Sequence, residues 1–211
     1  MTLRNITCAV TLCLLTLSGQ AVGKTEVPPY KNKSLSIEKR VDDLMGRMTL
    51  REKVLQLQNR GAGRLDEIDR IFNGESYGCT HEMGTTAAEC AAMYKELQQY
   101  MLTKTRLGIP IITSVEGIQG ILQNNCTLFP HALAQGSTFN PALIQRMTEA
   151  AGEEAKVIGI HQILSPVLDI ARELRWGRVE ETFGEDPYLI SEMGIAFING
   201  LSLIHISEPT R

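Results

Sequence analysis

Acidic and arginine side chains follow two apolar segments of this 211-residue sequence. Glu116 and Asp169 each come directly after a run with the length of a short buried strand, and Arg178 lies shortly after Asp169. The chain's single tryptophan, Trp176, is two residues before Arg178. Carboxylates and guanidinium groups hydrogen-bond hydroxyls, and an indole ring packs on C–H surfaces, so these residue types together predict a site for a polyhydroxylated ligand. An ion-pair network that pins a surface loop is the alternative that the same spacing allows.

The two apolar segments are Ile109–Val115 and Ile163–Leu168, and both read as short buried strands. Helical patterns alternate with them along the chain, which predicts βαβ units and a parallel sheet, the α/β class. In such folds the loops at the carboxyl ends of the strands form the ligand crevice. We therefore expect Glu116 and Asp169 to lie at one edge of the sheet.

Helix-start signals occur at five places in the chain. They are Ser36, Thr49, Thr86, Asn140 with Pro141, and Asp186 with Pro187. Thr49 and Thr86 are each followed three residues later by Glu, which is the spacing of a capping box. The helix after Asn140 should run through about Val157. Two apolar stripes are expected, one of Ile37, Val41, Leu44, Met45 and Met48, and one of Met93, Leu97, Tyr100 and Met101.

Metal-site patterns are weak in this sequence. The segment 81–85, His-Glu-Met-Gly-Thr, begins like a zinc metalloprotease helix but has Thr85 where the second histidine is needed. Cys79, His81 and Cys90 form only a weak zinc candidate. We predict no metal site, and the net charge of −3 suggests neither nucleic acid nor an anionic membrane as a partner.

The N-terminal 23 residues read as a secretory signal peptide. One arginine precedes a short apolar run, and small residues follow where a signal peptidase could cut. The mature protein should therefore be secreted or periplasmic and leave the membrane after cleavage, since no later segment is apolar enough to span a bilayer. Export leaves Cys79, Cys90 and Cys126. A Cys79–Cys90 bridge would close a short loop, but three cysteines define no framework.

Five motifs in order resemble the N-terminal barrel of glycoside hydrolase family 3, whose nearest members are exported bacterial β-glucosidases and β-xylosidases. They are 48–53 (MTLREK), 107–110 (LGIP), 127–131 with 137–141 (TLFPH and STFNP), 165–169 (SPVLD) and 175–187 (RWGRVEETFGEDP). The resemblance implies a (β/α)₈ TIM-like barrel, of which this chain would hold roughly the first three βα units. It also implies retaining hydrolysis of terminal nonreducing β-linked sugars in an oligosaccharide or β-glucoside, without any cofactor.

The resemblance assigns roles to three residues. Glu116 and Arg178 match the positions that hold hydroxyls of the terminal sugar, and Asp169 matches a position that orients the arginine-rich loop. Gln119 stands where the family often has histidine, which leaves the local hydrogen-bond network open. These are binding roles, so no catalytic residue is assigned within the chain.

The family's nucleophilic Asp and its acid/base lie downstream of the last motif. We therefore expect a truncated fragment, inactive alone, with a signal peptide at 1–23, barrel sequence at 24–201 and a non-native tail at 202–211. Two alternatives remain, a noncatalytic sugar-binding or decayed protein on the same fold and an N-acetylhexosaminidase-type relative. The sequence does not define the sugar, the linkage or the oligomeric state.

Overall fold

The computed structural model describes residues 27–82 and 85–202. The expected signal peptide, with Cys8 and Cys13, lies outside these ranges, as do residues 203–211 of the expected tail and residues 83 and 84 of the metalloprotease-like motif. The chain divides into two compact units, one that ends at Arg47 and one that begins at Met48. Within the described ranges, no helix combines the length and the apolar character that crossing a bilayer requires.

The first unit consists of a 3₁₀ turn, η1 (Pro29–Lys31), and the helix α1 (Ile37–Arg47). Ser36 Oγ accepts a hydrogen bond from Lys39 N at 3.4 Å, so the predicted cap is present. Asp43 Oδ2 accepts from Tyr30 N at 3.1 Å, which ties the turn to the helix. Four residues of the predicted apolar stripe lie on α1, and none of them is buried, whereas Met48 lies beyond the helix in the second unit and is buried.

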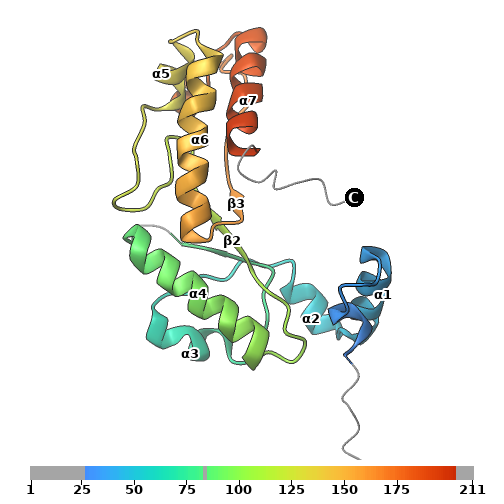
Figure 1. Cartoon of the computed structure of the whole chain (residues 1–211). Helices are drawn as coiled ribbons and strands as arrows, with labels where there is room; N and C mark the ends of the chain where they lie inside the picture. Colours follow the sequence, from blue (N-terminus) through green and yellow to red (C-terminus); the bar gives the residue numbers. More distant parts are fainter. Residues whose placement is uncertain (1–26, 83–84, 203–211) are drawn as a thin grey trace, which may run out of the picture. The chain divides into compact units, whose positions relative to one another are not determined.

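The second unit is built around a parallel sheet, as predicted. Its strands β1 (Cys79–His81), β2 (Ile112–Val115) and β3 (Gln162–Ile163) lie in the order β1-β2-β3. An isolated parallel bridge between Asn59 and Cys79 adds a further extended segment beside β1. The chain therefore folds as part of a TIM-like α/β architecture, with helices returning between successive parallel strands (Figure 1).

Both predicted strands are shorter in the structure than in the sequence analysis. The first was expected from Ile109. However, the Gln98 side-chain amide donates to Ile111 O at 2.5 Å and accepts from Ile111 N at 3.2 Å, so strand pairing begins only at Ile112. The second was expected to reach Leu168 but ends at Ile163. Pro166 has no amide hydrogen for a ladder, and Asp169 therefore lies in a loop beyond the strand.

Each predicted helix start is correct. Helices α2 (Leu50–Leu55) and α4 (Ala87–Lys104) both begin with a complete capping box. Helix α6 (Pro141–Ile158) begins after Asn140, whose side chain accepts from Leu143 N, and α7 (Pro187–Ser202) begins after Asp186, which accepts from Tyr188 N at 2.7 Å. The remaining elements are η2 (Leu65–Glu67), α3 (Ile68–Phe72), α5 (Ala132–Gly136) and η3 (Val179–Glu181).

Two groups of buried apolar side chains hold the second unit together. The larger one lies where α4 and the end of α6 pack on the sheet, and it includes the whole predicted stripe of α4. The smaller one joins α5, α6 and α7, which Figure 1 shows with α6 and α7 side by side. The members of the smaller group are Ala132, Ile144, Phe183, Ile190, Met193, Ala196 and Phe197.

An ion pair ties α2 to the connection between α4 and β2. Arg106 donates from Nε and Nη2 to the two carboxylate oxygens of Glu52, at 2.8 and 2.5 Å. This pair, together with the capping bonds from Thr49, lowers the pKa of Glu52 from its ordinary 4.5 to about 2. A carboxyl whose folded pKa is depressed contributes stability above its unfolded pKa and loses it as the pH falls.

We therefore expect Glu52→Gln to lower the free energy of unfolding by about 0.5–1 kcal/mol at pH 7, since an exposed pair contributes little and glutamine still fits the capping box. The variant should also flatten the decline in stability between about pH 4.5 and pH 2. Urea unfolding at several pH values measures both effects. Glu96→Gln on the exposed side of α4 is the control, and an equal loss there would contradict the assignment.

Candidate functional site

The loops that follow β2 and β3 lie together at the carboxyl edge of the sheet. Glu116, half-buried, is the residue after β2, and its carbonyl oxygen accepts from Leu122 N at 3.3 Å, which closes the turn. Gly117 packs against Ile163 of β3 so closely that a methyl group on it would overlap that side chain. The two strand ends are thus held in contact at the site.

Arg178 lies just before η3 and is held by Glu181 on the same turn. Its Nε donates to both carboxylate oxygens, at 3.0 and 2.9 Å, and its Nη2 donates to Glu181 Oε2 as well. The Arg178 side chain keeps 57% of its surface exposed, whereas Glu181 keeps 20%. Glu181 therefore fixes one side of the guanidinium group and leaves its other N–H groups available to a ligand.

The structure brings the three predicted site residues into one electrostatic cluster. The pKa of Arg178 is raised, first by the hydrogen bonds and charge of Glu181 and then by the charges of Asp169 and Glu116. Asp169 and Arg178 are exposed and Glu116 is half-buried. The residue after β2 and two residues of the loop after β3 thus lie within electrostatic reach of one another, and their binding of a hydroxyl-bearing ligand stays a prediction.

The same loop also contains the ion pairs that the alternative interpretation requires. Arg175 donates to Glu173 from Nε and Nη2, at 2.9 and 2.7 Å, and these bonds lower the pKa of Glu173 to about 2. Trp176 is half-buried, and its amide donates to the Glu173 carbonyl oxygen at 3.1 Å. Arg175 thus pairs within its own loop, whereas Arg178 lies near Asp169 and Glu116.

Buried polar atoms without a partner concentrate near this edge. Within the described residues, Gln119 Oε1, Ser165 Oγ and Gln135 Oε1 are enclosed and lack a hydrogen-bond partner. Gln119 is on the loop after β2, Ser165 follows β3, and the Gln135 amide donates to Ile118 O and Pro130 O of the adjoining loop. An unsatisfied buried polar atom costs about 1–3 kcal/mol, so each of these atoms lowers the stability of the loops around the site.

The residues of the zinc candidates are used elsewhere. His81 ends β1 and lies 3.4 Å from Ser114 Oγ, and the following Glu82 accepts from Ala62 N, so the motif lies at a strand end rather than on a helix. Among the described residues, no group of three or more His, Cys, Asp or Glu side chains could hold a metal ion.

Glu181 is the residue of this site that sequence reasoning missed. It is not one of the polar residues that directly follow a strand, yet it makes the closest contacts to Arg178. Its signal in the sequence is the i, i+3 spacing from Arg178, which pairs opposite charges within one helical turn. That spacing is common on solvated surfaces, so by itself it does not indicate a site. The charges of Asp169 and Glu116 near Arg178 are what associate this pair with the site.

The family model described as the glycosyl hydrolase family 3 N terminal domain matches residues 49–208. The chain belongs to glycosyl hydrolase family 3. The resemblance inferred from the five motifs is thereby confirmed, and so is the partial α/β TIM-like fold. The family match begins at the second residue of the second compact unit, which carries the sheet and the candidate site.

Two curated relatives and one solved structure illustrate the family membership. Beta-glucosidase C of Emericella nidulans is 34% identical over 191 residues, which are 82% of this chain and 31% of the relative. A beta-xylosidase of Formosa agariphila is 43% identical over 112 residues, 50% of this chain and 16% of the relative. A mutant beta-glucosidase of Listeria innocua, solved in complex with laminaribiose, has a TM-score of 0.65 and 30% identity over 80% of this chain and 24% of that one. The chain thus spans a third or less of the length of each.

Proposed function

We propose that the chain supplies the sugar-binding edge of an exported, retaining β-glycosidase, with β-glucosides as the first substrate class. The observation that carries this proposal is the cluster of Arg178, Glu116 and Asp169, formed by the end of β2 and the loop after β3 in a family 3 chain. The half-buried Glu116 accepts hydrogen bonds from sugar hydroxyls, and Arg178 donates them from the N–H groups that Glu181 leaves unused. Asp169 adds a second acidic group that helps to orient the guanidinium.

Retaining hydrolysis needs two carboxyl groups, a nucleophile that forms a glycosyl-enzyme intermediate and an acid that protonates the leaving oxygen. In the family these lie downstream of the RWGRVEETFGEDP motif at 175–187, so this part of the protein binds and orients the sugar. Similarity to beta-glucosidases and a beta-xylosidase supports the reaction class, and the laminaribiose complex of one relative supports a β-linked glucose ligand. The expected signal peptide at 1–23 supports a secreted or periplasmic location.

The decisive experiment is long-read sequencing across the 3′ end of the source gene, followed by expression of the complete reading frame. We expect a downstream lysine-histidine motif and a catalytic Asp, and hydrolysis of an aryl β-glucoside. An aryl β-xyloside and an aryl N-acetyl-β-glucosaminide, assayed in parallel, identify the sugar. A genomic stop codon directly after Arg211 would instead favour a noncatalytic sugar-binding protein.

If the two catalytic carboxyl groups lie downstream, as the family resemblance implies, the 211-residue chain by itself should show no glycosidase turnover. An aryl β-glucoside assay against a vector-only control measures this. Hydrolysis above the control would mean that catalytic carboxyls lie within the chain, and the assignment of roles would then be wrong.

A further inference from the structure

Of the three cysteines that the structure describes, it separates the two that are closest in sequence. Cys79 is on β1, and its Sγ lies 3.3 Å from Ser114 Oγ on β2. The next residue, Thr80, pairs in register with Thr113, and both are buried on the sheet face that packs against the helices. Because side chains alternate along a strand, Cys79 lies on the opposite face. A Cys79–Cys90 bridge would have to pass through the sheet, since Cys90 belongs to the helical side.

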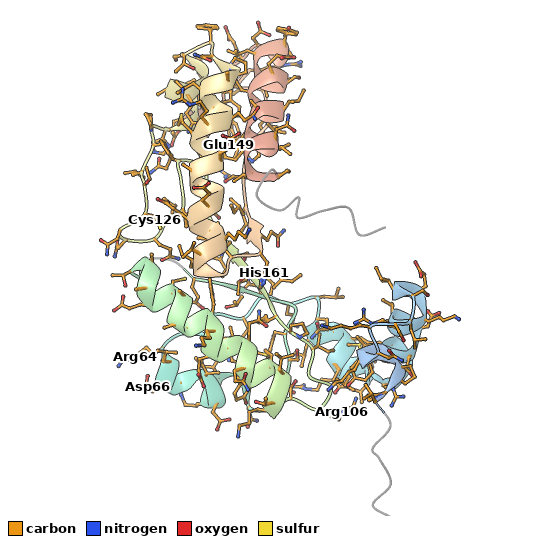
Figure 2. All side chains as sticks on the ribbon, viewed as in Figure 1. Arg64, Asp66, Arg106, Cys126, Glu149 and His161 are labelled. Carbon is orange, nitrogen blue, oxygen red and sulfur yellow. The ribbon has the colours of Figure 1, made fainter. Side chains whose placement is uncertain are left out.

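Cys90 and Cys126 lie on the same side of the sheet. Cys90 is in the first turn of α4 and is fully buried. Two backbone hydrogen bonds, Ala87 N to Asn124 O at 3.0 Å and Asn124 N to Thr85 O at 2.8 Å, fasten the turn that contains Cys126 to the start of that helix. Cys126 packs against the core cluster that contains Cys90. Figure 2 shows Cys126 on the loop that passes the beginning of α4 and the end of α6.

We propose that Cys90 and Cys126 form a disulfide when the protein is exposed to a disulfide oxidant, while Cys79 stays a free thiol. All three are free thiols in the structure. The Cys126 thiolate attacks oxidised glutathione, which forms a mixed disulfide and releases one glutathione thiolate. The Cys90 thiolate then attacks the Cys126 sulfur and releases the second glutathione. Two protein thiols are thus oxidised, and one glutathione disulfide is reduced to two thiols.

The order of attack follows from burial and charge. Cys126 is partly exposed, whereas Cys90 is enclosed, so the oxidant meets Cys126 first. Burial raises the pKa of both thiols. The nearby carboxylate of Glu154 raises that of Cys126 further, and the Cys90 group adds to the same shift. Since only the thiolate reacts, the exchange should be slow at pH 7 and faster toward pH 9.

The bridge would act on the loop that carries the candidate site. The turn at Gln123–Cys126 is closed by a hydrogen bond from Cys126 N to Gln123 O, and Leu122 N binds the carbonyl oxygen of Glu116. A covalent link from Cys126 to α4 would therefore tie the end of the Glu116 loop to a long, well-packed helix. The expected consequence is a more rigid site under oxidising conditions.

Peptide mapping of the full chain tests the pairing directly. The folded protein is incubated with oxidised glutathione at pH 8, alkylated without reduction, and digested with trypsin and Glu-C. Cleavage after Glu75, Glu82, Glu89, Lys95 and Glu116 separates Cys79, Cys90 and Cys126, and cleavage after Arg4 and Lys24 keeps Cys8 and Cys13 in a peptide of their own. We expect one cross-linked species that joins residues 90–95 to residues 117–146, with Cys79 alkylated in the peptide 76–82. The same reaction in 6 M guanidinium chloride should give mixed pairing. A folded sample with the mixed pattern, or with Cys79 in the bridge, overturns the proposal.

Thermal unfolding of matched variants gives a second readout. Oxidation should raise the melting temperature of the wild-type protein by about 5–10 °C, because a disulfide restricts the unfolded chain. Cys79→Ser should keep this rise and Cys126→Ser should lose it. The proposal fails if Cys79→Ser abolishes the rise or if Cys126→Ser retains it.

Discussion

Gly200→Ala should lower the free energy of unfolding by about 2–4 kcal/mol, because a methyl group there overlaps the neighbouring helix. Gly200 is buried on α7 where that helix packs against α6. A methyl group on Gly200 would overlap Thr148 Oγ1 and the backbone carbonyl oxygen of Gln145. The carbonyl is fixed within α6, so the helices must move apart. Helix propensity alone would make Gly200→Ala stabilising by about 1 kcal/mol. A measured loss of stability would therefore report the close packing of the two helices.

Gly177→Ala is the matched control for this prediction. Gly177 is exposed on the arginine-rich loop, and a methyl group there would meet no heavy atom within 4 Å. Urea unfolding followed by circular dichroism measures both variants. Equal midpoints for Gly200→Ala and the wild type would show that α6 and α7 are not packed as closely as the structure has them.

Local signals were sufficient to predict helices α1, α2, α4, α6 and α7, whereas the five-residue helices α3 and α5 were not predicted. The capping boxes at Thr49 and Thr86, and the capping residues Asn140 and Asp186, act within three or four residues, so the sequence alone contains the interaction. Strand β1 was not predicted, because its three residues, Cys79–His81, show no alternation of apolar and polar side chains that would indicate a strand. Its pairing with β2 supplies the hydrogen bonds, and that partner is more than thirty residues away in sequence.

The candidate site was predictable in its composition and only partly in its contacts. Placing Glu116 after a buried strand required only the apolar run before it. The strand expected to lead to Asp169 ends at Ile163, and Asp169 reaches the site through the loop that follows. The hydrogen bonds from Arg178 to Glu181 depend on the 3₁₀ turn η3, which no strong sequence pattern marks. The sequence also left the cysteine pairing open for a similar reason, since Cys79 and Cys90 are near each other in sequence but lie on opposite sides of the sheet.

Arg178→Ala in the complete enzyme should lower kcat/KM for an aryl β-glucoside by roughly 100-fold or more, because charge-assisted hydrogen bonds to the sugar are lost at a site that must orient it. The substitution also leaves the Glu181 carboxylate without its arginine. Arg178→Lys should recover little activity, since an ammonium group cannot hold Glu181 through two N–H groups and still present a planar donor set to the ligand.

Arg175→Ala is the control, because Arg175 lies on the same loop, is 88% exposed and pairs with Glu173 alone among the described acidic residues. It should change kcat/KM by less than about threefold, since a solvent-exposed pair contributes little. Steady-state kinetics at pH 6–7 on the three variants distinguishes sugar binding by Arg178 from an ion-pair network that only fixes the loop. If Arg175→Ala and Arg178→Ala lose activity equally, the arginines act together as a structural network and the ligand does not contact Arg178. If only Arg178→Ala is impaired and lysine does not rescue it, the guanidinium group beside Glu116 and Asp169 is the one that binds the sugar.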